Sequence, residues 1–279
     1  MLVRFALLAS LALSACAAGP STPTLKVFGD RLFIDAAVNG APVEALLDSA
    51  AEISFADRAW AEKIGLESSS AEIAKGSGGA EDVAFAEGVT IETLGVSLEG
   101  LKVAVLDLND LSTRLIGRPV RFIMGRELFD QERVSVDIES GMIAVVPRAM
   151  TPAGVALPLA SERGIETFSV RVNGREAKAE FDLGNGSDIL IGERFARSLG
   201  LLENPDALPR RKGGGVGGEI ERKVVRLASL DIAGRTFHDV EAAVDDLENA
   251  GDLNIGVRYL RHFLITADFA QRTIWLAPR

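Results

Sequence analysis

The sequence predicts an all-β protein of two similar lobes that are related by a pseudo-twofold axis, with one short helix in each lobe. The first observation behind this is a long repeat: Gly40 and Gly174, like Asp48 and Asp182, are separated by 134 residues (174 − 40 and 182 − 48). The second is that many apolar runs have the length of strands and are bounded by Gly, Asn, Pro or Asp. A repeat that brings one carboxylate per copy predicts two lobes that face each other.

Each copy begins with a predicted β-hairpin. Strand-length runs flank an Asn-Gly dipeptide in both copies: residues 32–38 and 43–47 in the first, and residues 168–172 and 177–181 in the second. Asn and Gly tolerate positive φ and therefore favour a tight hairpin turn. In both copies the second strand of the hairpin ends at an aspartate.

The elements after each aspartate also recur in order. Short helices are expected over residues 56–64 and 192–199, and each is followed by a Gly that suits a helix C-terminus. Glycine-rich segments and further strands come next, and both copies finish in an apolar turn that contains Gly125 or Gly256, at an offset of 131 (256 − 125). The shorter offset indicates that the second copy has lost a few residues from a surface loop. We expect an N-terminal lobe over residues 25–150 and a C-terminal lobe over residues 151–279, because prolines interrupt the chain near that boundary.

The first residues resemble a bacterial export signal. Residues 1–15 contain Arg4 and an apolar run that is too short to span a bilayer, and the run leads into Leu13-Ser14-Ala15-Cys16, which resembles a lipobox. We expect removal of residues 1–15, lipid attachment to Cys16 and a flexible tether over residues 16–24. An ordinary signal peptide, with Cys16 near the cut by chance, is the alternative. The lipid reading predicts a protein of the bacterial cell envelope that is anchored at the periplasmic face of the outer membrane.

Composition excludes several classes of function. The net charge of −10 and the lack of a basic patch argue against nucleic acid as a partner. Cys16 is the only cysteine, so the exported chain folds without a disulfide. The two histidines, His238 and His262, have no cysteine or further histidine nearby, and we therefore expect no metal site.

With these elements in place, the chain resembles the aspartic peptidases of the retropepsin and pepsin type. The strand that runs into Asp48-Ser49-Ala50 is similar to the family's strand into Asp-Thr/Ser-Gly, and Ile123-Met124-Gly125-Arg126 is similar to its apolar-apolar-Gly-Arg segment. The resemblance implies two retropepsin-like β-barrel lobes. It also implies that Asp48 and Asp182 share one proton, hold a water between them and hydrolyse an extended polypeptide as an endopeptidase without any cofactor.

The resemblance further implies that the glycine-rich segments are flaps that close over the substrate. The residues assigned to the flaps are Gly76, Ser77, Gly78 and Gly79 in the first copy, and Gly214, Gly215, Gly217 and Gly218 in the second. Both halves of the site lie in one chain, so we expect a monomer.

Two residues depart from the family pattern. Ala50 stands where the family carries Gly, whereas Gly184 keeps the pattern; Leu183 stands where the family carries Thr or Ser, whereas Ser49 keeps it. The hydroxyl at that position bonds across to the other lobe, and its loss costs about 1 kcal/mol. These departures favour an alternative function, a catalytically impaired module that binds a peptide in the cell envelope. A third reading is a purely structural duplicated β domain in which both aspartates are turn residues.

The same resemblance predicts an ion pair between Glu52 and Arg126 that braces the first-lobe site, with Gly186 at the matching place in the second lobe. The alternative for Glu52 is a capping box, since Ser49-Ala50-Ala51-Glu52 fits the Ser-x-x-Glu pattern of a helix start. Asp137 and Asp268 also recur, but each lies between a strand and a turn sequence, and we expect both to be structural.

Overall fold

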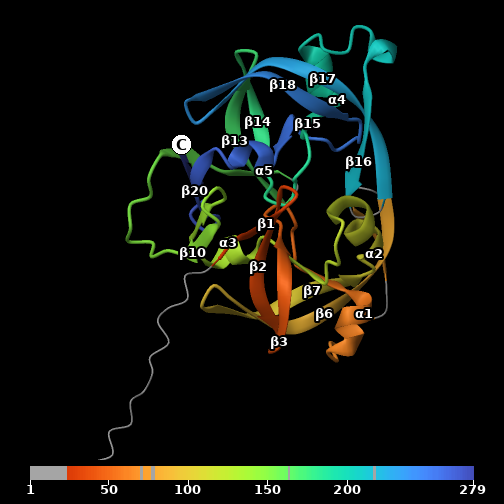
Figure 1. Cartoon of the computed structure of the whole chain (residues 1–279), viewed down its shortest axis with the longest axis vertical. Helices are drawn as coiled ribbons and strands as arrows, with labels where there is room; N and C mark the ends of the chain where they lie inside the picture. Colours follow the sequence, from red (N-terminus) through yellow and green to blue (C-terminus); the bar gives the residue numbers. More distant parts are fainter. Residues whose placement is uncertain (1–23, 70–71, 77–78, 163, 216–217) are drawn as a thin grey trace, which may run out of the picture.

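The computed structural model describes residues 24–69, 72–76, 79–162, 164–215 and 218–279 (Figure 1). The strands form three sheets, of which two have eight strands and one has five. Each eight-stranded sheet belongs to one half of the chain, and the five-stranded sheet combines strands from both halves. This arrangement confirms the predicted all-β fold of two similar lobes.

The sheet of the first lobe has the strand order β1-β2-β3-β8-β4-β7-β6-β5, and an additional pairing of β2 with β6 folds it back on itself. The strands are β1 (Lys26–Phe28), β2 (Arg31–Val38), β3 (Ala41–Leu47), β4 (Phe55–Asp57), β5 (Glu72–Gly76), β6 (Gly79–Thr93), β7 (Val96–Leu106) and β8 (Phe122–Met124).

The sheet of the second lobe has the order β12-β13-β14-β19-β15-β18-β17-β16, with β13 also paired to β17. Its strands are β12 (Ala160–Glu162), β13 (Ile165–Val172), β14 (Arg175–Phe181), β15 (Ile189–Gly192), β16 (Arg210–Gly215), β17 (Gly218–Ile232), β18 (Arg235–Asp245) and β19 (Leu253–Ile255). The two orders match strand for strand, so the repeat seen in the sequence is a repeat of topology.

The predicted hairpins are confirmed in both lobes. β2 pairs with β3 and β13 pairs with β14, both antiparallel. The turn residues have the left-handed conformation that such a connection needs, with φ of 47° at Asn39 and 79° at Gly40, and of 50° at Asn173 and 79° at Gly174. The hairpins therefore deliver the two aspartates at equivalent positions.

The two predicted helices are α1 (Arg58–Lys63) and α4 (Glu193–Ser198). Asp57 caps α1, because its side chain accepts a hydrogen bond from the Trp60 backbone N–H. The structure adds short helical segments that sequence analysis missed: α2 (Asn109–Leu111), η1 (Ser112–Ile116), α3 (Glu127–Gln131), η2 (Pro205–Ala207) and α5 (Val257–Leu260). Each is too short to show helical periodicity in the sequence.

The five-stranded sheet joins the lobes in the order β10-β9-β20-β21-β11. Its strands are β9 (Val134–Asp137), β10 (Met142–Val145), β11 (Val155–Pro158), β20 (Phe263–Asp268) and β21 (Thr273–Pro278). The link between the halves is the antiparallel pairing of β20 with β9. The last strand of the chain, β21, lies between β20 and β11.

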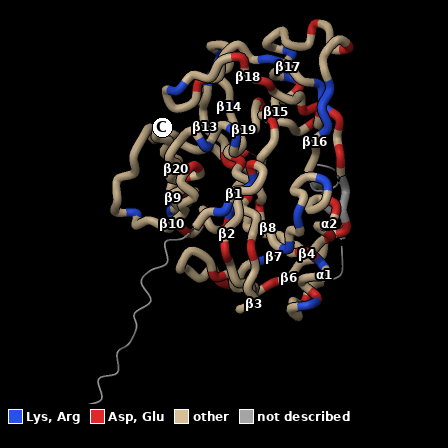
Figure 2. The backbone as a smooth tube through the Cα atoms, in the orientation of Figure 1, with Lys and Arg blue, Asp and Glu red and all other residues tan. Residues whose placement is uncertain are grey.

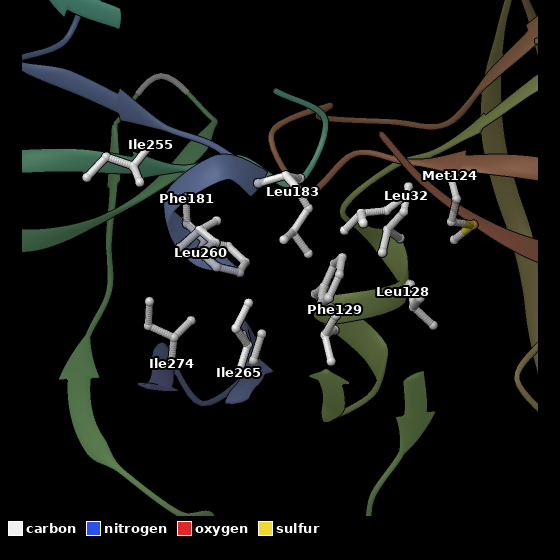
Figure 3. Close-up of a cluster of buried hydrophobic side chains, with 14 of the residues drawn as sticks. Leu32, Met124, Leu128, Phe129, Phe181, Leu183, Ile255, Leu260, Ile265 and Ile274 are labelled. Carbon is white, nitrogen blue, oxygen red and sulfur yellow. The ribbon is translucent and has the colours of Figure 1, made fainter. Parts of the chain in front are cut away.

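The main hydrophobic core is continuous between the lobes. The ring centroids of Phe129 and Phe269 lie 5.2 Å apart with the rings tilted by 33°, and Phe181 packs edge-on against Phe269. Figure 3 shows that the side chain of Leu183 points into this cluster, on the side of Phe129. Leu183 is fully buried, so the lobes are held together by packing next to the aspartate loops as well as by the joining sheet.

Candidate active site

Asp48 directly follows β3 and is fixed by backbone hydrogen bonds. Its backbone N–H donates to the Met124 carbonyl at 2.9 Å, which ties it to the end of β8, the parallel neighbour of β3. One carboxylate oxygen accepts hydrogen bonds from the backbone N–H groups of Ala50 (3.0 Å) and Ala51 (3.1 Å). The loop after β3 therefore orients the carboxylate.

Asp182 occupies the equivalent place after β14. Its backbone N–H donates to the Ile255 carbonyl at 3.2 Å, at the end of β19. Oδ1 accepts from the backbone N–H groups of Gly184 (2.8 Å) and Asn185 (3.0 Å), and Oδ2 accepts from the Asn254 side-chain amide (2.8 Å). Asp182 thus has a side-chain donor, whereas Asp48 has none among the described residues.

The two aspartate loops meet at the junction of the lobes. A Cβ atom at position 184 would lie under 3.0 Å from Cγ and from both carboxylate oxygens of Asp48, a separation that real Cβ atoms essentially never show. The Asp48 carboxylate therefore packs directly on the backbone of the loop that follows Asp182. A glycine is required at position 184 because only a residue without a side chain leaves this space.

Both carboxyl groups have raised pKa values. Burial, together with repulsion from the Asp182 charge, raises the pKa of Asp48 to about 7. Burial also raises the pKa of Asp182, but the hydrogen bonds from Asn254, Asn185 and Gly184 oppose this rise by stabilising the charged form. The environment therefore favours the proton on Asp48 and the charge on Asp182, and the pair titrates as a unit.

Ser49 makes the cross-lobe contact that the family pattern implies, and Leu183 replaces its counterpart by packing. The Ser49 hydroxyl donates to the Phe181 carbonyl at 2.9 Å and accepts from the Leu183 backbone N–H at 2.9 Å. Leu183 offers no hydroxyl in return, but its side chain is buried in the core between the lobes. Apolar burial thus offsets the hydrogen bond that the substitution removes. Ala50, the other departure, is only half-buried, and its Cβ is accommodated.

The predicted ion pair between Glu52 and Arg126 is wrong. The Arg126 guanidinium instead pairs with Asp130 (2.9 Å) one helical turn along α3, and with the buried Glu166 of the second lobe (2.9 Å). Arg126 also donates to the Gly164 carbonyl. The reason is that Arg126 lies at the start of α3, from which its side chain reaches across the lobe junction.

The capping-box alternative for Glu52 is also wrong, because no helix begins at Ser49 and α1 starts only at Arg58. Glu52 is exposed, and its carboxylate lies against the backbone of Gly164 in the second lobe.

The glycine-rich segments form hairpins, β5 with β6 in the first lobe and β16 with β17 in the second. Gly76 pairs with Gly79, and Gly215 pairs with Gly218. Figure 1 shows β16 reaching from the second lobe towards α2 of the first. There the Arg114 guanidinium donates to the carbonyls of Gly213 (3.4 Å) and Gly215 (3.0 Å). The predicted flap residues Ser77, Gly78 and Gly217 lie outside the described residues.

The recurring Asp137 and Asp268 lie away from the two aspartate loops. Asp268 is fully buried and accepts hydrogen bonds from Arg133 (3.2 Å) and Arg148 (3.0 Å). Asp137 accepts from the Ser140 backbone N–H and pairs with Arg279. Both carboxylates have structural partners.

The predicted leader and the lipidation site, Cys16, fall within residues 1–23, which are not among the described residues. A helix with the length and apolar character to cross a membrane does not occur in the described part of the chain. In the same part, no three residues among His, Cys, Asp and Glu gather as metal ligands would.

Two residues beside the aspartates were missed in the sequence. Asn254 lies 131 residues after Ile123 (254 − 123), the offset of the closing turns, so a polar side chain replaces an apolar one in the second copy. A comparison of the two copies could have found it. The other is Arg31, whose side chain lies against the loop after Asp182 although the residue precedes the first aspartate by 17 positions (48 − 31); no local pattern in the sequence marks it.

The fold and the paired aspartates define a class of protein, the two-lobed aspartic peptidase-like proteins. A family model described as aspartyl protease matches residues 34–120 and 168–259, one segment in each lobe. These segments make up more than half of the chain, and the protein belongs to this family. The comparison with curated proteins found no match.

Solved structures resemble the chain at low sequence identity. Basic 7S globulin from soybean is 11% identical with a TM-score of 0.53, and the match covers 92% of this chain and 94% of the globulin. A retropepsin-like aspartic protease from Rickettsia conorii is 20% identical with a TM-score of 0.34, and the match covers 44% of this chain and 87% of the protease. The globulin match supports the same two-lobed fold over almost the whole chain.

Proposed function

We propose that this protein is an aspartic endopeptidase that hydrolyses peptide bonds of an extended polypeptide at the junction between its lobes. The observation that carries the proposal is the contact of the Asp48 carboxylate with the loop that follows Asp182, together with the raised pKa of Asp48. Two carboxyl groups that share one proton can act as acid and base on the same water and carbonyl. In a merely structural domain, an aspartate in a turn would not need to be buried against the loop that carries the second aspartate.

The asymmetry of the hydrogen bonds assigns the two roles. Asp182, with its three donors, is the charged general base that takes a proton from the attacking water. Asp48 is the general acid and gives its proton to the carbonyl oxygen of the substrate, so that the attack yields a neutral gem-diol. Asp182 then gives the proton that it took from water to the amide nitrogen, while Asp48 takes a proton back from a gem-diol hydroxyl. The C–N bond breaks, the products are a carboxylic acid and an amine, and the dyad regains its starting state.

The proposal extends to the setting of the enzyme. Both aspartates come from one chain, so a monomer is sufficient for activity. The lipobox-like Leu13-Ser14-Ala15-Cys16 supports lipid attachment at Cys16, which would keep the enzyme at the periplasmic face of the outer membrane. Its substrate in that setting is another polypeptide.

The experiment that tests the proposal is hydrolysis in labelled water. The purified full chain is incubated with an unfolded protein in H₂¹⁸O between pH 3 and pH 9, with EDTA present to inhibit contaminating metalloproteases. Mass spectrometry of the fragments should find one ¹⁸O in each new C-terminal carboxylate. Cleavage should fall as pH rises through about 7, because Asp48 then loses its proton.

The peptide-binding alternative gives a different result in the same preparation. A protein that binds a fluorescent extended peptide, as measured by polarisation, but yields no fragment at any pH would be a binding module. That outcome would contradict the proposed function.

Asn254 tests the assignment of the base. Replacing Asn254 by Leu removes the hydrogen bond to Asp182 Oδ2 and should raise the pKa of Asp182 by about one unit, because a hydrogen bond to a charged group contributes about 1.5 kcal/mol or more. Asp182 must be charged to act as the base. The acid limb of the kcat/KM profile should therefore move by the same amount towards neutral pH.

The control for this variant is Glu180→Gln. The Asn254 amide also donates to Glu180 at 3.0 Å, so the control alters the other acceptor and leaves the Asp182 contact in place. Its acid limb should stay close to that of the wild type. An unchanged profile in Asn254→Leu would show that the amide does not stabilise the base.

A further inference from the structure

Arg31 is a buried cation at the lobe junction whose guanidinium has few hydrogen-bond partners among the described residues. It is the first residue of β2, and only 7% of its surface is exposed. Nη2 donates to the Ser187 hydroxyl at 3.2 Å, whereas Nη1 is buried and has no hydrogen-bond partner among the described residues. An unpaired buried charge is costly, and such a group calls for an explanation.

The Arg31 guanidinium contacts the loop that carries Asp182. A Cβ atom at position 186 would lie under 3.0 Å from Nη1, so this nitrogen packs on the backbone of Gly186. Two residues earlier in the loop, Gly184 packs on the carboxylate of Asp48. One short loop therefore contacts both Asp48 and Arg31.

The repeat explains why Arg31 has no acid opposite it. At the offset of 134, Arg31 corresponds to Ile165 (165 − 31) and Glu52 corresponds to Gly186 (186 − 52). Arg31 thus faces a glycine at the position where the first lobe carries an acid. Glu52 in turn lies against Gly164, next to the position that corresponds to Arg31. The repeat thus places a cation, Arg31, at one of the two cross-lobe contacts and an acid, Glu52, at the other.

The other acids near Arg31 already have cations of their own. Asp30 pairs with Arg261 at 2.7 Å and with Arg258 at 3.4 Å. Asp188, next to Ser187 in the loop, pairs with Arg258 at 2.9 Å and with Arg211. Figure 2 shows charged residues of both signs gathered where the lobes meet, near β1 and β19.

In the described part of the chain, neither Asp48 nor Asp182 forms an ion pair with another cation. Burial lowers the pKa of Arg31, and attraction by the charges of Asp182 and Asp48 opposes this lowering. Arg31 in turn lowers the pKa of both aspartates. Glu180, the remaining acid beside Asp182, accepts a hydrogen bond from Asn254.

We propose that Arg31 is the counter-charge of the dyad, a fixed cation from the first lobe that holds Asp48 and Asp182 together in the singly charged state. With one proton on the dyad, its charge of −1 balances the guanidinium. A second proton would leave a buried cation without compensation, so the dyad resists it. In this role Arg31 is a positioning residue that touches neither the substrate nor the attacking water.

The test is a titration that needs no cleavage. Aspartate labelled with ¹³C at Cγ is incorporated into the full chain, and the dyad signals are assigned from the Asp48→Asn and Asp182→Asn variants. In Arg31→Gln, the lower apparent pKa of the dyad should rise by about one unit, as expected when a nearby opposite charge is removed. In Arg31→Lys, which keeps the charge, the lower pKa should stay closer to that of the wild type.

The matched control is Arg222→Gln. Arg222 is another buried arginine, with 6% of its surface exposed and Nε without a partner among the described residues, but it lies on β17 and pairs with Asp245. This variant should leave the dyad titration unchanged. An equal shift in Arg31→Gln and Arg222→Gln, or no shift in either, would overturn the proposal.

A thermal-unfolding cycle at pH 5.5 covers the case in which Arg31→Gln folds poorly. The substitution should lower the unfolding temperature by about 3 °C or more in the wild type, and by much less in the Asp48→Asn/Asp182→Asn background, where the dyad has no charge to balance. If Arg31→Gln by itself does not fold, but the triple variant that combines it with Asp48→Asn and Asp182→Asn does fold, this result would support the same coupling between Arg31 and the dyad. Equal losses in both backgrounds, or a triple variant that does not fold although its Asp48→Asn/Asp182→Asn parent does, would show that Arg31 serves packing alone.

The inference concerns the dyad on which the proposed function rests, but the two can fail separately. If the protein cleaves no substrate but Arg31→Gln still shifts the dyad titration, the proposed function is wrong and the role of Arg31 as counter-charge is supported. If the protein cleaves its substrate but Arg31→Gln does not shift the dyad titration, the proposed function is supported and the role of Arg31 as counter-charge is wrong.

Discussion

Replacing either Asp48 or Asp182 by Asn should lower kcat/KM for an unfolded protein substrate by about 10³-fold or more, because general acid and general base catalysis each contribute about 10²–10⁴-fold. Asn is nearly isosteric with Asp, so the loops around the dyad keep their hydrogen bonds to the remaining oxygen. The measurement is the initial rate of cleavage at a pH below about 7, where Asp48 keeps its proton.

The control for these variants is Asp137→Asn. Asp137 also recurs in both copies and caps a turn, but it lies outside the dyad. Its substitution should leave kcat/KM within a few-fold of the wild type. Cleavage that persists in both dyad variants would assign the activity to other groups.

Asp48→Asn has a second expected effect, on stability, that does not depend on activity. The pKa of Asp48 in the folded protein, about 7, lies above that of an unfolded aspartate. The folded state therefore binds the Asp48 proton more tightly than the unfolded chain does. The contribution of this proton to the free energy of unfolding is fully present below about pH 4 and is progressively lost as pH rises through 7. Asp48→Asn removes this loss. Its unfolding temperature, relative to the wild type, should rise between pH 5 and pH 8 in a calorimetric series.

Gly184→Ala should remove most of the activity although it replaces neither aspartate. The added methyl group would lie under 3.0 Å from Cγ and both oxygens of Asp48, which two backbone hydrogen bonds hold in place. The carboxylate or the loop must therefore move. A displacement of about 1 Å at a catalytic site costs about 10²-fold in rate, and overpacking costs about 1–3 kcal/mol of stability. Cleavage rates and thermal unfolding measure the two effects.

The repeat supplies a matched control in Ala50→Gly. Ala50 stands at the position that corresponds to Gly184 (184 − 134), and there the Cβ atom is already accommodated. Removal of this methyl group should leave the cleavage rate close to that of the wild type. Equal tolerance of both changes would mean that the aspartate loops are looser than their contacts indicate.

Much of the fold could be predicted because its signals are local and occur twice. The Asn-Gly turns fix the hairpins, the hairpins fix where Asp48 and Asp182 lie, and the constant offset indicates that the two positions are equivalent. The short helices α2, η1 and α5 escaped prediction because one or two turns leave no periodicity in the sequence.

The contacts across the lobe junction could not be predicted in the same way. Arg126 was assigned to Glu52 within its own lobe, whereas the packed lobes bring Glu166 to it from the other side. The position of Arg31 on the second aspartate loop likewise depends on how the lobes dock. Only Asn254 left a readable signal, because an amide replaces the Ile123 of the first copy. Charge pairs between lobes depend on the assembled interface, which the repeat does not specify.

The place of the last strand has a consequence for biosynthesis. β20 and β21 follow the two eight-stranded sheets in the sequence, and the sheet that joins the lobes cannot close until β20 reaches β9 and β21 reaches β11. Each lobe carries only one aspartate of the dyad, so a nascent chain with a finished first lobe lacks half of the proposed hydrolytic centre. Under the proposed function, the chain would thus become competent only once both lobes have been made and joined, which protects the growing polypeptide and its neighbours from premature cleavage.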